Sequence, residues 1–405
     1  MHSRRDILKS AGGAAFGWGA GLFAASRLAR AAETATLPFA NGERPLVAYP
    51  GKRPLLVLTA RPPQLETPFA VFNESVITPN DAFFVRYHLA DIPLKIDPDA
   101  YSIEVKGKLD KPSTISLQEL KTGFDAVELV AVNQCSGNGR GFFEPRVAGG
   151  QLGNGAMGNA RWKGVPLKAV LDKAGVQKGA AQVAFDGLDG PVVPETPDFV
   201  KALDIDHARD GEVMLAYAMN GDDLPWLNGY PVRLVVPGYY GTYWVKHVSQ
   251  ITVTDTPFDG FWIKSAYRIP ANSCACTEPG KAPTSTVPIN RFNVRSFITS
   301  ISEGAKLRAE EETPLRGIAF DGGYGIAEVA VSSDGGQSWT AAKLGQDLGK
   351  YSFREWNAAV KLPKGEHKLM VKATNKVGQS QPFEPLWNPP GYMRNVIETT
   401  RVTAA

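Results

Sequence analysis

A single cysteine in a polar, glycine-rich segment is the residue of this chain best placed to hold a metal. Residues 132–140 read VNQCSGNGR, with Cys135 after an apolar run and Arg140 shortly beyond it. Glycines let backbone approach a bulky group closely, and a nearby arginine favours the thiolate, the form that binds metals. One cysteine cannot build an iron–sulfur or structural zinc site. It can be the sole protein ligand of a metal whose other ligands come from a cofactor; the alternative is an ordinary buried cysteine.

Basic and aromatic residues alternate in residues 84–88, which read FVRYH. In a strand, the side-chain period of two would place Phe84, Arg86 and His88 on one face. A cation and an imidazole beside an aromatic ring suit an anionic cofactor or substrate. The alternative is a partly exposed strand face that carries unrelated charges.

A second set of basic residues lies on glycine-rich segments further along the chain. Lys246 and His247 follow residues 237–244, PGYYGTYW, and Arg233 precedes that run. Basic side chains on such loops can bind phosphate groups. The alternative is a set of surface loops, and the residues alone do not choose between the two.

The first 31 residues have the pattern of an export signal. Residues 3–9, SRRDILK, form a twin-arginine motif, an apolar stretch rich in Gly and Ala covers residues 11–25, and residues 29–31, ARA, form a cleavage site. We therefore expect a periplasmic mature chain that starts at Ala32. A membrane anchor is the alternative, but the stretch is short and glycine-rich for a span. The twin-arginine route carries folded proteins, which is most useful when a cofactor is inserted before export.

Charge and cysteine content exclude several classes of protein. The formal charge of +3 comes from the signal, because the remaining chain has a net charge of −1. A nucleic acid or an anionic membrane surface is therefore not expected as a partner. No long apolar run follows the signal, which predicts no membrane span in the mature protein, and the lack of a C-x-x-C-H motif predicts no haem c in this chain. Cys274 and Cys276 have an awkward spacing for pairing with each other and are expected to be loop thiols.

The elements that must position these groups fall into two regions. Residues 32–278 mix strand and helix patterns, including an apolar run at 126–132 that predicts a buried strand just before Cys135. Helical spacing of apolar residues over 167–174 predicts a helix that ends at Gly175. After a linker at 279–283, PGKAP, the apolar residues Ala327, Val329 and Val331 recur at a spacing of two. We expect an α+β fold, with a mixed domain over 32–278 and an all-β sandwich of immunoglobulin type over 279–405.

With these motifs, the chain resembles the sulfite oxidase family of molybdenum enzymes over essentially its whole mature length. The order and number of the shared stretches carry the resemblance. They are FVRYH at 84–88, CSGN at 135–138 with Arg140, GNARW at 158–162, FDGLD at 185–189, GYPVR at 229–233 with PG at 237–238, VK at 245–246, SDGG at 333–336 with Trp339, and WN at 387–388. The two expected domains then resemble the family's molybdopterin domain and its dimerisation domain.

The resemblance implies a cofactor and its contacts. Cys135 matches the thiolate that ligates molybdenum, whose dithiolene sulfurs come from one molybdopterin per metal. Animal relatives have a histidine where this chain has Asn228. The residues that match the family's pterin and phosphate contacts are Phe84, Val85, Arg86, Tyr87, His88, Asp189, Asn228, Arg233, Trp244, Val245 and Lys246.

The resemblance also implies a reaction and a partner. Arg86, Arg140 and Tyr267 match the family's substrate pocket, although Tyr267 is followed by Arg268 where the animal motif has lysine. The implied reaction is oxidation of sulfite to sulfate. Animal relatives carry an N-terminal haem domain, whereas here the signal leads almost directly into the molybdenum region. As in the family's bacterial sulfite dehydrogenases, a c-type cytochrome is therefore the expected electron acceptor, either docked transiently or held as a stable haem c subunit.

Two other functions remain open at this point. One is an exported molybdenum-dependent reductase on the same scaffold, acting on nitrate or on a sulfoxide. The other is a secreted binding protein with an immunoglobulin-like module and no catalysis, which would need neither folded export nor a lone cysteine beside an arginine.

Overall fold

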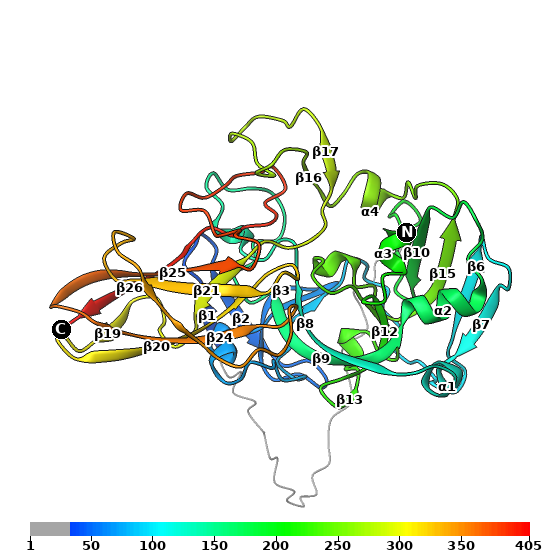
Figure 1. Cartoon of the computed structure of the whole chain (residues 1–405), viewed down its shortest axis with the longest axis horizontal. Helices are drawn as coiled ribbons and strands as arrows, with labels where there is room; N and C mark the ends of the chain where they lie inside the picture. The colour runs from blue at the N-terminus through cyan, green and yellow to red at the C-terminus, as the bar shows by residue number, and fades with distance from the viewer. Residues whose placement is uncertain (1–32) are drawn as a thin grey trace, which may run out of the picture.

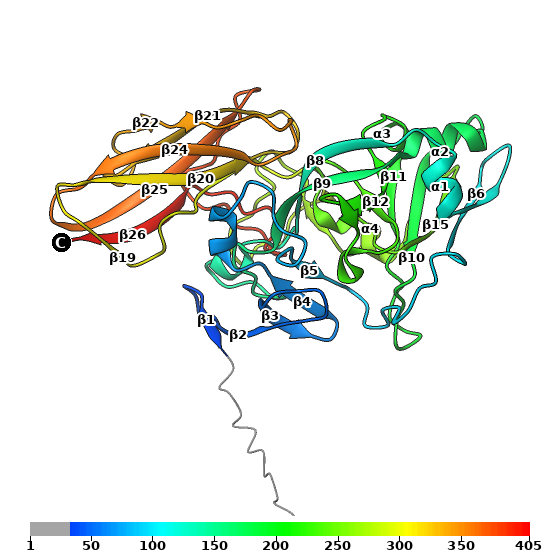
Figure 2. The same ribbon diagram turned by 90° about the horizontal axis from the view of Figure 1, so that it is seen from below.

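A computed structural model describes residues 33–405, so the signal expected at residues 1–31 lies outside the described part of the chain. Two larger regions lie side by side, with a small N-terminal sheet against their junction (Figures 1 and 2). Within residues 33–405, no helix is long and apolar enough to cross a bilayer. The N-terminal sheet is antiparallel and consists, in order, of β1 (Thr34–Thr36), β2 (Glu43–Val47), β3 (Leu55–Ala60), β4 (Pro63–Glu66) and β5 (Val85–Arg86).

Two further sheets build the rest of the first region. One has the order β11-β10-β15-β6-β7, in which β15 and β6 run parallel. Its strands are β6 (Ser102–Gly107), β7 (Ser113–Ser116), β10 (Gln182–Gly187), β11 (Lys201–Asp204) and β15 (Val248–Thr254). The other has the order β13-β12-β9-β8, with β14 paired to β12. Its strands are β8 (Val127–Gln134), β9 (Met157–Pro166), β12 (Met214–Met219), β13 (Asp222–Asp223) and β14 (Arg233–Val235).

Helices are few and short, so the expectation of an α+β fold is only partly confirmed and the described chain is mostly β. The α-helices are α1 (Leu117–Thr122), α2 (Leu167–Ala174), α3 (Ile205–Ala208) and α4 (Phe261–Lys264). The single-turn 3₁₀ helices are η1 (Phe69–Asn73), η2 (Arg140–Phe142), η3 (Trp226–Asn228) and η4 (Gly241–Tyr243). The predicted helix over 167–174 is confirmed as α2, which ends at Gly175 with φ of 72°. A left-handed residue at this place is the usual helix stop.

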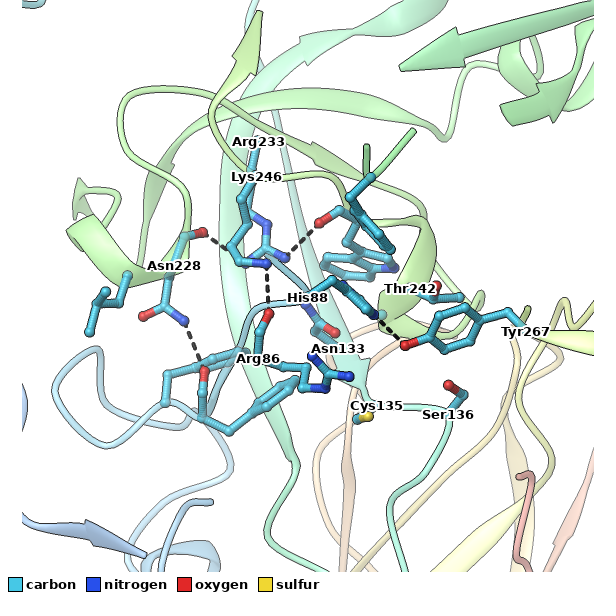
Figure 3. Close-up of a pocket in the computed structure, with 16 residues that line it drawn as sticks. Arg86, His88, Asn133, Cys135, Ser136, Asn228, Arg233, Thr242, Lys246 and Tyr267 are labelled. Atoms are coloured by element: carbon cyan, nitrogen blue, oxygen red, sulfur yellow. Dashed lines mark hydrogen bonds between the residues drawn. The ribbon is translucent and has the colours of Figure 1, made fainter. Parts of the chain in front are cut away.

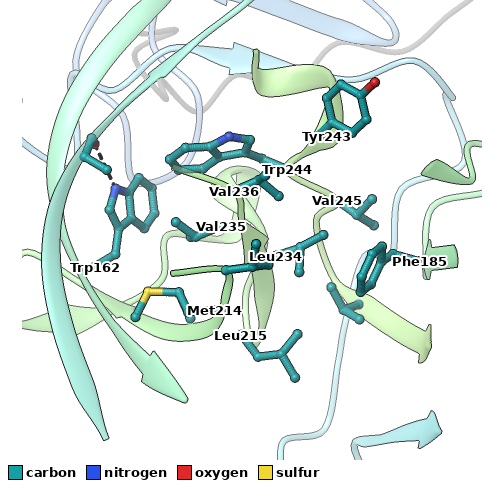
Figure 4. Close-up of a cluster of buried hydrophobic side chains, with 14 of the residues drawn as sticks. Trp162, Phe185, Met214, Leu215, Leu234, Val235, Val236, Tyr243, Trp244 and Val245 are labelled. Atoms are coloured by element: carbon teal, nitrogen blue, oxygen red, sulfur yellow. Dashed lines mark hydrogen bonds between the residues drawn. The ribbon is translucent and has the colours of Figure 1, made fainter. Parts of the chain in front are cut away.

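The hydrophobic core behind the site draws on both sheets of the first region. Trp162 of β9 and Trp244, just after η4, are buried with ring centroids 5.5 Å apart. Leu234 and Val235 of β14 belong to the same cluster (Figure 4). The Trp162 indole N–H donates to the carbonyl oxygen of Ala131 in β8 at 3.0 Å. This packing fixes the chain between residues 233 and 246, whose polar side chains reach the site described below.

The second region is a two-sheet sandwich, as the sequence predicted. One sheet has the order β18-β20-β24-β23 and the other β19-β26-β25-β21-β22. Leu315 and Trp356 from the first sheet pack on Leu369 and Val371 from the second, all fully buried. The strands are β18 (Arg295–Ile298), β19 (Ala305–Leu307), β20 (Glu312–Phe320), β21 (Ile326–Ser332), β22 (Thr340–Ala341), β23 (Lys343–Leu344), β24 (Arg354–Lys361), β25 (Gly365–Asn375) and β26 (Glu398–Ala404). Its classification as immunoglobulin-like stays a prediction.

One strand pattern of the sandwich was predicted in the wrong register. Val329 and Val331 face the core, but Ala327 is exposed and Ile326 is buried in its place. The pairing of β21 with β25 shifts between Ile326 and Glu328. Such a bulge inserts an extra residue and reverses the inward and outward alternation on one side of it.

The segment between the two regions also differs from the expectation. Residues 279–283 lie in the loop of a hairpin formed by β16 (Arg268–Pro270) and β17 (Thr286–Pro288). Cys274 and Cys276, expected to be loop thiols, instead form a disulfide with each other, with their Cα atoms 5.1 Å apart. That separation is within the ordinary range for a disulfide, and Ala275 between them has φ of 50°, which turns the chain sharply enough to bring the two sulfurs together.

Candidate active site

A cavity opens where β5, the end of β8 and the chain around residues 228–246 meet. Figure 3 shows the polar side chains that point into it. Its lining residues are Phe83, Phe84, Arg86, His88, Asn133, Cys135, Ser136, Phe199, Leu227, Asn228, Arg233, Gly241, Thr242, Trp244, Lys246 and Tyr267.

Cys135 lies in this cavity, directly after β8, as the sequence predicted. It is the free cysteine of the described residues and is 8 % exposed. Its backbone N–H donates to the carbonyl oxygen of Ala156 at 2.9 Å, and its own carbonyl accepts from the N–H of Asn138 at 3.0 Å. These bonds fix the turn so that the sulfur faces the cavity (Figure 3). A thiolate held this way can ligate a soft metal.

The alternation expected for residues 84–88 is confirmed, although β5 itself contains only two residues. Phe84, Arg86 and His88 line the cavity. Val85 and Tyr87 point the other way into a small separate hydrophobic cluster and do not line it. Through their side chains, these two residues support the face that carries Arg86 and His88.

His88 and Tyr267 meet at one end of the cavity. The Nε2 of His88 is hydrogen-bonded to the Tyr267 hydroxyl, and the His88 ring stacks on Phe199 with centroids 3.7 Å apart. Burial lowers the pKa of His88 well below its ordinary value, and the neighbouring positive charges of Arg86 and Lys246 lower it further. The imidazole is therefore neutral at physiological pH.

Arg233 and Lys246 form the cationic end of the cavity. Arg233 donates to the carbonyl oxygens of Asn228 at 2.9 Å and Trp244 at 3.2 Å, and Lys246 donates to the Arg86 carbonyl at 2.8 Å. Neither cation has a carboxylate within ion-pair distance in the described residues. Burial lowers the pKa of Lys246 to about 7 and that of Arg233 to about 9, and the attraction of Asp189 only partly offsets the effect on Lys246. Buried cations without a partner are suited to an anionic group such as a phosphate.

Several polar atoms in the cavity wall lack a hydrogen-bond partner although they are buried. They are the Asn133 Oδ1, the Ser136 hydroxyl, the Thr242 hydroxyl and the Arg233 Nε. Buried polar groups are normally paired, so a set of unpaired ones around a cavity indicates a polar ligand. A pterin with its phosphate offers the donors and acceptors that this wall needs, and Cys135 offers the metal ligand, so the donor set fits a molybdenum–molybdopterin cofactor.

The remaining predicted residues lie around this centre but not all of them line the cavity. Asp189 and Val245 are buried behind it, and the attraction between Asp189 and Lys246 opposes the pKa rise that burial causes in Asp189. Arg140 lies beside the cavity and donates through Nε to the Pro390 carbonyl at 3.0 Å. Its guanidinium carbon is 4.9 Å from the ring centroid of Tyr392.

Sequence reasoning missed several lining residues. Asn133 and Ser136 flank Cys135 in the same motif, and Thr242 lies in the glycine-rich run before Lys246, so motif neighbourhood could have identified all three. Leu227 directly precedes the predicted contact Asn228, whereas Phe199 carries no comparable signal, because only the fold brings its segment to the cavity.

Comparisons with known proteins match the chain to molybdopterin-binding oxidoreductases. Residues 88–262 match the family model of the oxidoreductase molybdopterin binding domain, and residues 286–404 match that of the Mo-co oxidoreductase dimerisation domain. The chain is 33 % identical to human mitochondrial sulfite oxidase over 91 % of this chain and 70 % of that protein. It is 32 % identical to chicken sulfite oxidase over 92 % of this chain and 80 % of that protein.

Two further matches widen the comparison. Barley nitrate reductase is 30 % identical over 86 % of this chain but 42 % of its own length. The crystal structure of the sulfane dehydrogenase SoxCD from Paracoccus pantotrophus superposes with a TM-score of 0.72 at 24 % identity, covering 95 % of this chain and 92 % of that chain. At this identity the superposition establishes a shared fold.

Proposed function

Since the chain belongs to the sulfite oxidase family of molybdopterin-binding oxidoreductases, we propose that it oxidises sulfite to sulfate at a molybdenum centre ligated by Cys135. The observation that carries the proposal is the position of Cys135 in a cavity that has unpaired cations at one end and a tyrosine–histidine pair at the other. When bound, the molybdenum cofactor supplies oxygen-atom transfer and two-electron redox chemistry, which side chains do not provide.

The cationic end would hold the cofactor. Arg233, Lys246 and Asn228 would bind the phosphate and pterin, with Trp244 and Phe84 as apolar walls. Lys52 holds Asn228 and the chain at Phe83 in place at this end of the cavity. Its Nζ donates to the Asn228 Oδ1 at 2.5 Å and to the Phe83 carbonyl at 3.0 Å. A bound phosphate would restore the ordinary, higher pKa of Lys246 by supplying the missing counterion.

The opposite end would bind sulfite. The guanidinium groups of Arg86 and Arg140 are planar and carry several N–H donors, which match an oxyanion in geometry and charge. Tyr267 keeps its proton because burial raises its pKa, so the hydroxyl remains a hydrogen-bond donor. With its proton on Nε2, neutral His88 would donate to the Tyr267 oxygen, which leaves the hydroxyl hydrogen free to donate to the substrate. These side chains bind and orient the anion beside Cys135.

The electron acceptor and location complete the proposal. We propose that electrons leave one at a time to a c-type cytochrome in the periplasm, after folded export by the twin-arginine route. The motif at residues 3–9 supports export, and the acceptor follows from the expected lack of a haem site in this chain. Periplasmic fractions would contain the wild-type protein, whereas a double Arg4→Lys, Arg5→Lys variant would remain in the cytoplasm.

A substrate comparison tests the reaction against its nearest rival. The similarity to barley nitrate reductase makes nitrate reduction the second candidate. The purified holoprotein is assayed for cytochrome c reduction with sulfite, and for nitrate or sulfoxide reduction with a reduced dye. Turnover of sulfite alone supports the proposal, and turnover of nitrate or a sulfoxide without sulfite would replace it by the reductase function.

A further inference from the structure

A segment of the C-terminal region returns to the active site. The connection between β25 and β26 carries residues 387–395 back to the loops beside Cys135, as seen in both ribbon views (Figures 1 and 2). The Met393 N–H donates to the Ser136 carbonyl at 3.2 Å, and the Trp387 indole N–H donates to the Pro145 carbonyl at 2.8 Å. These bonds, with the one from Arg140 to Pro390, hold the segment against the metal-binding loop.

Tyr392, on this segment, contacts two residues of the proposed sulfite pocket at once. Its ring lies parallel to that of Tyr267, with centroids 5.5 Å apart and an interplanar angle of 6°. The Arg140 guanidinium carbon is 4.9 Å from the centroid of the same ring. Burial raises the pKa of Tyr392, so its hydroxyl stays protonated. One half-buried ring therefore connects an arginine of the first region to the tyrosine beside β16.

Neighbouring residues of the same segment hold the Tyr392 ring in place. The buried Asn388 accepts from the Tyr392 N–H at 3.0 Å and donates to the Tyr392 carbonyl at 2.9 Å. Gly391 has φ of 62°, and a Cβ there would approach Val147 to 2.4 Å and the Arg140 Cγ to 3.0 Å. A residue with a side chain at this position would push the segment away from Arg140.

Arg140 depends on these contacts because it has few others. Among the described residues it forms no ion pair, and its side chain contacts the Pro390 and Gly150 carbonyl oxygens and the Tyr392 ring. An arginine that binds an oxyanion must be held in one rotamer before the anion arrives, or the anion must order it at a cost in affinity. The ring of Tyr392 supplies a face on which the guanidinium rests.

We propose that Tyr392 is a positioning residue of the oxyanion pocket, which acts by holding Arg140 and Tyr267 in their binding geometry. The inference rests on the proposed sulfite chemistry and assigns this role to one side chain of the C-terminal region. The aromatic ring, rather than the hydroxyl, carries the effect.

Kinetics of three variants test this role. Tyr392→Leu should raise KM for sulfite on the order of tenfold, as loss of a cation–π contact predicts, with a smaller change in kcat. Tyr392→Phe, which keeps the ring, should restore a KM near that of the wild type. Tyr324→Leu removes an exposed tyrosine that does not line the cavity, and it should leave KM unchanged. An unchanged KM in Tyr392→Leu, or a Phe variant as impaired as the Leu variant, would overturn the proposal.

A double-mutant cycle distinguishes a positioning role of Tyr392 from a general destabilisation of the fold. If Tyr392 acts through Arg140, Tyr392→Leu should add little to the effect of Arg140→Gln. Fully additive effects would show that Tyr392 does not act through Arg140. Tyr392→Met, an unbranched replacement, takes the place of Tyr392→Leu if the latter fails to fold, as judged by circular dichroism and molybdenum content.

Sulfate binding to the holoprotein, measured by calorimetry, separates this proposal from the proposed function. The Kd for sulfate should rise in Tyr392→Leu by the same factor as the KM for sulfite. A wild-type holoprotein that does not turn over sulfite, but loses sulfate affinity in Tyr392→Leu, would overturn the proposed function while supporting the positioning role. Equal sulfate affinity in the two proteins would overturn the positioning role.

Discussion

His88 and Tyr267 are 179 positions apart in the sequence, yet the imidazole Nε2 and the phenol oxygen share a hydrogen bond at the edge of the cavity that contains Cys135. The local backbone conformation places each of the two side chains at the cavity. His88 follows the two-residue strand β5, and Tyr267 has φ of 58°, an uncommon conformation for a tyrosine. Strained backbone of this kind is most often found where function requires a particular side-chain direction.

Tyr267→Phe should lower kcat/KM for sulfite by about tenfold to a hundredfold, because it removes a hydrogen-bond donor to a charged substrate. The ring, its stacking on Tyr392 and the fold remain. Steady-state kinetics with cytochrome c or ferricyanide as acceptor measures the effect. An unchanged kcat/KM with both acceptors would show that the hydroxyl does not contact the reacting anion.

Arg86→Gln should raise KM for sulfite by about tenfold or more, since a charge-assisted bidentate contact to the oxyanion is lost. Arg53→Gln serves as the control, because Arg53 lies at the surface and pairs with Asp81 and Glu74. Its KM should equal that of the wild type. If Arg86→Gln also retained the wild-type KM, Arg86 would have no place in the substrate pocket.

Glu398→Gln should lower the free energy of unfolding by about 3 kcal/mol, because it leaves buried Arg295 without its counterion. Glu398 accepts from Arg295 at 2.7 Å and from Arg394 at 2.6 Å. Glu303→Gln, which breaks the exposed pair with Arg401, should cost no more than about 0.5 kcal/mol. Urea unfolding measures both, and equal losses in the two variants would contradict the assignment of a structural role to the buried pair.

The free energy of unfolding of the cofactor-free protein should rise with pH above neutrality. Burial lowers the pKa values of Lys52, Lys201 and Lys246 to about 7, far below the value in an unfolded chain. Above pH 7 the unfolded chain therefore binds more protons than the native one, and stability increases with pH. The expected gain is about 1 kcal/mol per lysine between about pH 7.5 and 8.5.

Lys201→Met isolates one of these three contributions. The Nζ of Lys201 has no carboxylate partner in the described residues; it donates to the Trp262 carbonyl at 2.6 Å and lies 5.2 Å from the Tyr267 ring centroid. In this variant, the free energy of unfolding should rise with pH at about two thirds of the wild-type slope. A stability that is flat or falling over this range in the wild type would show that the buried lysines titrate normally.

Local patterns predicted much of the site because its residues lie in short motifs. The period of two at residues 84–88 correctly placed Phe84, Arg86 and His88 on one face, and the apolar run before Cys135 correctly predicted the strand that ends there. The same reasoning could not separate side chains that line the cavity from those that support it. Val85 and Tyr87 match the family's motif as well as Arg86 does, but their side chains point away from the cavity.

Features that depend on contacts between distant segments were not predicted. The N-terminal sheet is stabilised by pairing across strands of two to six residues, too short for a clear periodic signal. A bulge in β21 reversed the expected alternation at Ala327. The left-handed conformation of Ala275, which permits the disulfide between Cys274 and Cys276, has no signature in the sequence. Tyr392 reaches the site only because the segment between β25 and β26 folds back onto the first region.

The most direct test of the account is a paired assay of the wild type and Cys135→Ser, both purified from a host that makes the molybdenum cofactor. Molybdenum content and sulfite-dependent reduction of a c-type cytochrome are measured on the same samples, with circular dichroism as the check of folding. We expect equimolar molybdenum and sulfite-dependent reduction in the wild type, and a folded Cys135→Ser protein that reduces no cytochrome. A wild-type protein without molybdenum, or a Cys135→Ser variant that still oxidises sulfite at the wild-type rate, would contradict it.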